Sequence, residues 1–244
     1  MSNEVAGAGS RAGVNAGAGL GSRREFGEGP LARAVAMVYS LLAIELLLLV
    51  TTVPGLIPLV LLNRDGSNVP LAAACAIPLG PAVSAALYAL RHHRGDLADL
   101  RPAAAFWRGY RLNLGGVLRL WIPWLLWMTV VGVSIAHRAA ADIPGWWVDT
   151  LVVLAAASAL WIANALVITS LFAFRPIDVA RLAAYFLGRT RGVTLGNLCL
   201  LIVAAGITVL SSEAVLALFG SLLTAMLLRT CTPLIDRITE EFTV

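Results

Sequence analysis

Long apolar runs alternate with shorter polar segments from residue 34 onward. A membrane-spanning helix needs about 20 mostly apolar residues to cross the ~30 Å hydrocarbon core of a bilayer. The pattern therefore predicts six spanning helices, at about 34–53, 70–90, 117–136, 150–174, 193–211 and 214–228. The first run extends to Leu62 if its prolines are accommodated. The last is so short that it either continues past Arg229 or is re-entrant.

The arginines test this topology independently, because cationic residues are retained on the cytoplasmic side during insertion. All 18 cationic residues of the chain are Arg. If the N-terminus is cytoplasmic, 16 of the 18 fall in cytoplasmic segments, and Arg64 and Arg138 fall outside them. The distribution therefore predicts an even number of crossings with both termini in the cytoplasm.

The composition indicates a membrane protein rather than a single soluble core. The 244 residues are 59% hydrophobic and 13% charged, which is more apolar surface than a soluble domain of this size buries. We expect an all-α, polytopic transmembrane helical bundle over residues 31–244, with short amphipathic interfacial helices on the cytoplasmic side. Residues 1–30 are rich in Gly and Ala and predict a disordered cytoplasmic tail. The pI near 9.4 follows from arginine-rich segments that attract anionic lipid headgroups, so nucleic acid is not an expected partner.

The second predicted helix contains a candidate hinge. Pro78 and Pro81 remove backbone hydrogen bonds near mid-membrane, which is tolerated where neighbouring groups cover the freed carbonyls. Gly80 belongs to a row of small residues, with Ala76 and Ser84, that lets another helix approach closely. The sequence predicts a central, kinked helix and leaves open whether the kink moves or is fixed.

A short amphipathic segment precedes the third predicted helix. Its apolar residues follow helical spacing, while its arginines lie on the other side, as in a helix at the membrane interface. The segment 103–121 also matches 183–201 at seven of 19 positions, which suggests a duplicated unit. Headgroup contact and docking of a partner protein both fit this cytoplasmic interface, which comprises Arg101, Phe106, Trp107, Arg108, Tyr110 and Arg111.

Few polar side chains fall within the predicted crossings. Glu45 lies near the bilayer centre, where an ionised carboxylate costs at least ~2.5 kcal/mol. It is either a neutral acid hydrogen-bonded to a facing group such as Asn164 or Thr51, or part of a proton, cation or substrate path. Asn164 and Asn197 are typical of residues that join membrane helices through hydrogen bonds.

The tryptophans of the third helix allow two interpretations. Three of them, Trp121, Trp124 and Trp127, follow one another at intervals of three residues. Such rings stack on sugar faces or, more commonly, pack between helices.

Motifs of catalysis and of metal or cofactor binding are missing from the sequence. Its three cysteines are scattered, and no HExxH, GxSxG or CxxC pattern is present. We therefore expect neither an enzyme nor a cofactor or metal site.

Four stretches resemble the YesL-like family of small bacterial integral membrane proteins. They are TTVPGLIP, PLGPAVSAALYALRHHRGD, FWRGYRLN and LFAFRPIDVARLAAYFLGRTRG. The resemblance implies a bundle of five or six crossings in the bacterial cytoplasmic membrane, no known enzymatic activity, and an association with carbohydrate uptake and polysaccharide breakdown. Glu45 departs from the family pattern. The expected function is a non-catalytic accessory role beside a sugar-uptake permease or other membrane protein; the alternative is a small secondary transporter that uses Glu45.

Overall fold

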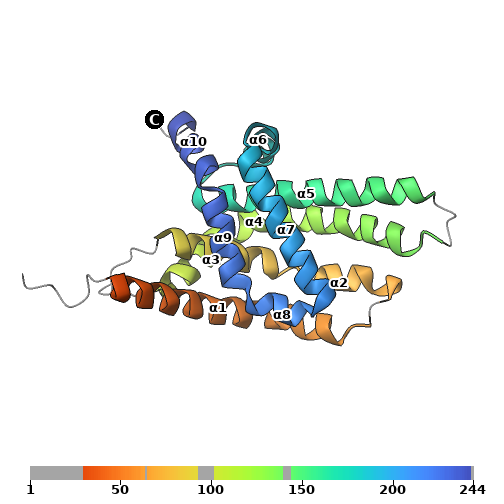
Figure 1. Cartoon of the computed structure of the whole chain (residues 1–244), viewed down its shortest axis with the longest axis horizontal. Coiled ribbons are helices and arrows are strands. Elements are labelled where there is room, and N and C mark those ends of the chain that lie inside the picture. Colours follow the sequence, from red (N-terminus) through yellow and green to blue (C-terminus); the bar gives the residue numbers. More distant parts are fainter. Residues whose placement is uncertain (1–29, 64, 93–101, 140–143, 243–244) are drawn as a thin grey trace, which may run out of the picture.

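The computed structural model describes residues 30–63, 65–92, 102–139 and 144–242. Throughout these ranges the regular structure is helical and there is no strand, which confirms the all-α prediction (Figure 1). The predicted tail at 1–30 lies outside the described residues except for Pro30, where the first helix begins. The elements are α1 Pro30–Leu61, η1 Gly66–Asn68, α2 Val69–Cys75, α3 Leu79–His92, α4 Pro102–Ala136, α5 Gly145–Leu171, α6 Pro176–Arg189, α7 Arg191–Leu210, α8 Glu213–Leu218, α9 Gly220–Thr230 and α10 Thr232–Phe242.

Five segments of the described chain are long and apolar enough to cross a membrane. They are Ala34–Leu61, Gly66–His92, Pro102–Ala136, Gly145–Leu171 and Arg191–Leu210. Each coincides with one of the first five predicted crossings. The chain is thus a polytopic membrane protein.

The second crossing is divided into two helices rather than kinked. α2 ends at Cys75 and α3 begins at Leu79, because Pro78 has no N–H to continue the helical hydrogen bonds. In the turn between the two helices, the carbonyl of Ala76 accepts hydrogen bonds from Leu79 N–H at 3.2 Å and from Trp121 Nε1 at 3.0 Å. A Cβ on Gly80 would lie 2.6 Å from the Trp121 ring, so glycine at this position makes room for the tryptophan.

The third crossing is longer than its apolar run predicts. α4 has 35 residues and is about 52 Å long at 1.5 Å per residue, which exceeds the ~30 Å hydrocarbon core. The amphipathic segment is therefore not a separate interfacial helix; it forms the first turns of α4. These turns are held against α3, since Phe106 is fully buried and a Cβ on Gly109 would lie 2.7 Å from Tyr88.

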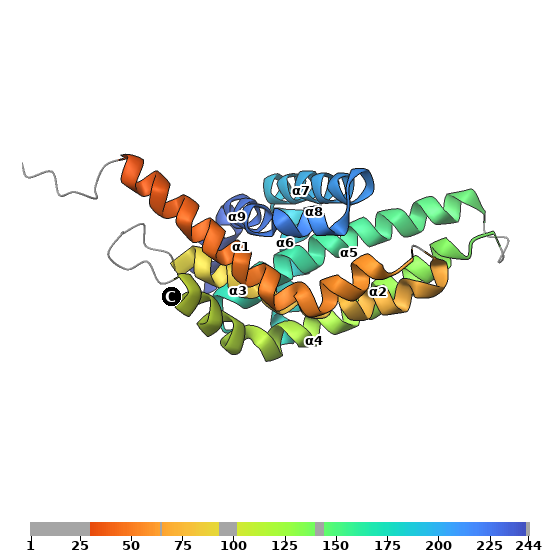
Figure 2. The ribbon, with the colours of Figure 1, turned by 90° about the horizontal axis from the view of Figure 1, so that it is seen from below.

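The sixth apolar run does not form one straight helix. It is interrupted between α8 and α9 at Phe219 and Gly220, and glycine is a weak helix former. The chain turns at α8, and α9 returns beside α7 towards α10 (Figure 1). Viewed from below, α7, α8 and α9 form a layer that lies across α3 and α5 (Figure 2).

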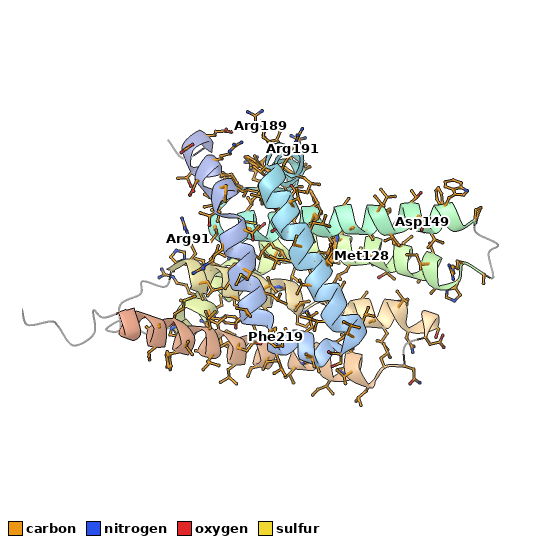
Figure 3. All side chains as sticks on the ribbon, viewed as in Figure 1. Arg91, Met128, Asp149, Arg189, Arg191 and Phe219 are labelled. Carbon is orange, nitrogen blue, oxygen red and sulfur yellow. The ribbon has the colours of Figure 1, made fainter. Side chains whose placement is uncertain are left out.

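Charged residues mark the ends of the bundle. Arg91 ends α3, while Arg189 and Arg191 flank the junction of α6 and α7. Asp149 lies near the other end of the molecule, in the first turns of α5 (Figure 3).

Candidate functional site

A cavity of about 450 Å³ lies between the layer of α7, α8 and α9 and the helices α1, α3 and α5. This volume is in the range of small-molecule pockets in proteins. Most of its wall is aliphatic, and the larger lining residues include Leu48, Leu56, Leu59, Leu79, Val83, Leu160, Leu200, Leu201, Leu216, Leu223 and Leu227.

The break in the second crossing contributes to this cavity. Cys75, Ala76 and Pro78 line it where α2 gives way to α3. Of the candidate hinge residues, Pro78 reaches the cavity wall, whereas Gly80 packs on Trp121 and Pro81 is buried. The turn between α2 and α3 is thus part of the site.

A few polar groups interrupt the apolar wall. Thr52, Thr208 and Thr224 lie within it, as do Asn197 and Glu213. The hydroxyl groups of the three threonines donate to carbonyls of the preceding turn of their own helix. Their hydrogen bonds are therefore satisfied within the helix, and they add little polarity to the cavity.

Glu45 lies next to this cavity and contacts the start of α9. Its Oε2 accepts a hydrogen bond from the backbone N–H of Ser221 at 2.6 Å. Its Oε1 is buried and has no hydrogen-bond partner among the described residues. The partners suggested by the sequence are wrong, because Thr51 donates to the carbonyl of Leu47 and Asn164 pairs with another side chain.

That other side chain is Asn197. Its Nδ2 donates to Asn164 Oδ1 at 3.1 Å and also contacts Cys231 Sγ at 3.5 Å. The three residues join α5, α7 and the turn before α10, and all are buried. We call them the asparagine cluster, and its bonds are of the kind that stabilise contacts between membrane helices.

The thiol of Cys231 is chemically quiet in this cluster. Burial raises its pKa to about 11, and the hydrogen bond with Asn197 opposes part of the rise. Since the thiolate is the nucleophilic and metal-binding form, this cysteine is a packing residue. Cys75 and Cys199 are also free thiols.

The tryptophans of α4 do not line the cavity. Trp124 Nε1 donates to Ser158 Oγ at 3.4 Å, and the Trp124 ring packs on Trp121 with centroids 4.8 Å apart. Trp127 is 43% exposed on the outside of the bundle. These positions correspond to packing between helices and contact with lipid.

The predicted cytoplasmic interface divides into two faces. Phe106 is buried in a cluster of apolar residues from α1 and α3, so it is inaccessible to a partner. Trp107, Arg108 and Arg111 are exposed and Tyr110 is half-buried. Arg101 lies outside the described residues.

Two features of the site have no clear signal in the sequence. The cavity is lined by residues from helices far apart in the sequence, and the Ser221 N–H that binds Glu45 is a backbone group. Across the described ranges no cluster of three or more His, Cys, Asp or Glu side chains could hold a metal ion.

No protein-family model matches the chain, and no curated protein or solved structure matches it. The resemblance to the YesL-like family therefore stays a prediction from the sequence. The class of protein follows from the helices themselves, which are those of a polytopic membrane protein.

Proposed function

We propose that this protein is a non-catalytic membrane protein that holds a hydrocarbon chain in its cavity. The observation that carries the proposal is the aliphatic lining, to which α1, α3, α5, α7, α8 and α9 all contribute. A flexible apolar chain fills such a space without leaving polar groups unpaired. The binding function needs no cofactor.

The same lining argues against passage of a sugar or a hydrated ion through this cavity. Either solute would exchange its hydrogen bonds with water for contacts with leucine side chains, and such transfer is costly. A transport path that uses Glu45 is the alternative, but the wall of the cavity beside this residue is mostly aliphatic. Transport is therefore the second candidate function, after binding of a hydrocarbon chain.

We further propose that the protein acts as an accessory component in the bacterial cytoplasmic membrane, with six crossings and both termini in the cytoplasm. The return of α9 beside α7 supports a sixth crossing made of α8 and α9. The exposed arginines at the start of α4 suit anionic headgroups. A sugar-uptake permease as partner rests on the family resemblance alone, and co-purification in mild detergent tests it.

The cavity is tested with two neighbouring positions on α7. Ala204 lines the cavity, whereas Val203 is 51% exposed on the outer surface. Ala204→Phe fills part of the cavity, and Val203→Phe adds the same ring outside it. Each protein is purified, exchanged into lipid-free detergent and analysed for retained lipid by mass spectrometry.

We expect wild type and Val203→Phe to retain one chain-bearing molecule per protein and Ala204→Phe to lose it. Gel filtration in the same detergent confirms that both variants are folded. Equal retention by the two variants would mean that the bound lipid lies on the outer surface, and the proposal would be wrong.

A further inference from the structure

Apolar contact alone cannot select a ligand inside a membrane. Lipid tails are as apolar as leucine side chains, so moving a chain from the bilayer into the cavity gains little hydrophobic energy. Selection then depends on polar groups, because an unpaired polar atom in apolar surroundings is costly. The polar atoms beside the cavity therefore decide which molecule binds.

Glu45 provides such an atom at the α1–α9 side of the cavity. It precedes Leu48 of the cavity wall by one helical turn, and Gly220 of α9 is also part of that wall. A Cβ on Gly220 would lie 3.5 Å from Glu45 Oε1 and 3.4 Å from Leu48 Cδ1. The carboxyl group is thus separated from the cavity by a residue that has no side chain.

The two carboxyl oxygens of Glu45 differ in what they can still bind. Oε2 accepts from Ser221 N–H, whereas Oε1 is buried without a partner among the described residues. Oε1 already lies beside Gly220 of the cavity wall. A ligand head at this part of the wall can therefore approach Oε1 while Oε2 keeps its hydrogen bond from Ser221 N–H.

The N-terminus of α9 favours a negative charge at this place. Its free N–H groups and the helix dipole stabilise an anion, and Glu45 already accepts a hydrogen bond from one of these groups. Acidic side chains within membranes are usually paired with another polar or charged group. A positively charged, hydrogen-bond-donating group on the cavity side would complete the site.

We propose that the cavity binds a single-chain amphiphile whose head donates hydrogen bonds to Glu45 Oε1, as an ammonium or hydroxyl group does, while its hydrocarbon chain lies among the leucines. This inference rests on the proposed function, since it requires that the cavity hold a chain. It adds the class of the ligand and the end of the cavity at which its head lies.

The test compares probes that share one chain. Hexadecane, hexadecanol and hexadecylamine compete against tritiated hexadecylamine for the purified protein in nanodiscs, in a scintillation proximity assay. Wild type should bind hexadecylamine and hexadecanol at least about tenfold more tightly than hexadecane, which is the effect of one hydrogen bond to a charged group. Equal binding of the three probes would overturn the proposal.

Glu45→Gln tests the assignment of the head group. The amide oxygen still accepts from Ser221 N–H, but the amide nitrogen that replaces Oε1 only donates hydrogen bonds. Because an ammonium group has no acceptor, hexadecylamine should bind Glu45→Gln no better than hexadecane does, with tritiated hexadecane as the probe. Hexadecanol, whose oxygen also accepts, should keep part of its advantage.

Two other variants make the test specific. Asp149→Asn removes one negative charge far from the cavity and should leave the preference for hexadecylamine unchanged. Glu213 lies in the wall of the cavity at the start of α8. If Glu213→Gln rather than Glu45→Gln removes the preference, the head lies at the other acidic residue and the proposal is wrong.

The design separates failure of this inference from failure of the proposed function. If the cavity holds a chain but Glu45 does not bind its head, hexadecane binding by Glu45→Gln equals that of wild type and the preference for hexadecylamine persists. If the cavity holds no chain, Ala204→Phe binds tritiated hexadecane as well as Val203→Phe does. The two results cannot be confused.

Discussion

The asparagine cluster and the Glu45 contact are both buried polar sites in the same bundle, yet they are built differently. In the cluster, Asn197 binds a side chain on α5 and a thiol beside α10. Glu45 binds one backbone N–H of α9. Each site also leaves one buried atom without a partner among the described residues, Asn164 Nδ2 in the cluster and Glu45 Oε1 beside the cavity wall. The first arrangement joins three segments and the second joins two. The comparison favours a structural role for the cluster, whose side chains link three segments, and a binding role for Glu45, whose unpartnered oxygen lies beside Gly220 of the cavity wall.

The largest expected effect comes from breaking the cluster at its centre. Asn164 Nδ2 already has no partner among the described residues, and Asn197→Leu also removes the partner of Asn164 Oδ1. The substitution should therefore lower the free energy of unfolding by about 1–2 kcal/mol. Replacing both partners removes the unpaired groups. The double variant Asn164→Leu/Asn197→Leu should therefore be more stable than Asn197→Leu. Unfolding in mixed micelles of a mild detergent and SDS measures all three, and additive losses would contradict the role assigned to the cluster.

The second expected effect concerns the thiol of the cluster. With its pKa raised to about 11, only about a thousandth of Cys231 is thiolate at pH 8. In a Cys75→Ala/Cys199→Ala background, N-ethylmaleimide should modify the native protein very slowly at pH 8 and faster as the pH approaches 11. The same protein unfolded in SDS is the control. Rapid modification of the native protein at pH 8 would show that the cluster opens.

The effect of the raised pKa on stability has a definite sign. An unfolded cysteine ionises at its ordinary pKa of 9.0, whereas the folded thiol resists ionisation until about 11. The unfolded state thus binds fewer protons between these two values, and the folded state loses stability as the pH rises through this window. Below pH 8 the thiol should make no pH-dependent contribution.

The smallest expected effect is that of Glu45→Gln on stability. The amide oxygen keeps the hydrogen bond from Ser221, so the free energy of unfolding should stay within about 0.5 kcal/mol of wild type. The mixed-micelle assay used for the asparagine variants allows direct comparison. A loss as large as that of Asn197→Leu would make Glu45 a structural residue and remove the distinction between the two sites.

Much of the fold could be predicted from the sequence because membrane helices are recognised by the length and hydropathy of their apolar runs. The first five crossings follow from apolar runs of sufficient length. The continuity of α4 was missed because hydropathy falls in its first turns, while packing of Phe106 and Gly109 on α3 keeps the backbone helical. The interruption at Phe219 was missed because a single glycine in an apolar run does not identify a break.

The candidate site was predictable only in part. An acidic residue in an apolar run marks a position that needs a partner, which identified Glu45. Its partner is 176 residues away and is a backbone group, and backbone groups are the same at every position of a sequence. The pairing of Asn164 with Asn197 also depends on the contact between α5 and α7, which composition does not specify. The cavity depends on the three-dimensional arrangement of seven helices, from α1 to α9 without α4 and α6.

The division of the last apolar run bears on how the protein is made. α8 has 6 residues and α9 has 11, so each is too short to be inserted into a bilayer alone. In the proposed six-crossing topology, α8 and α9 therefore enter the bilayer together, as one hairpin with α7. In that topology the part of the cavity wall that α8 and α9 contribute is added after the other five crossings, and a chain that stops at Leu210 lacks it.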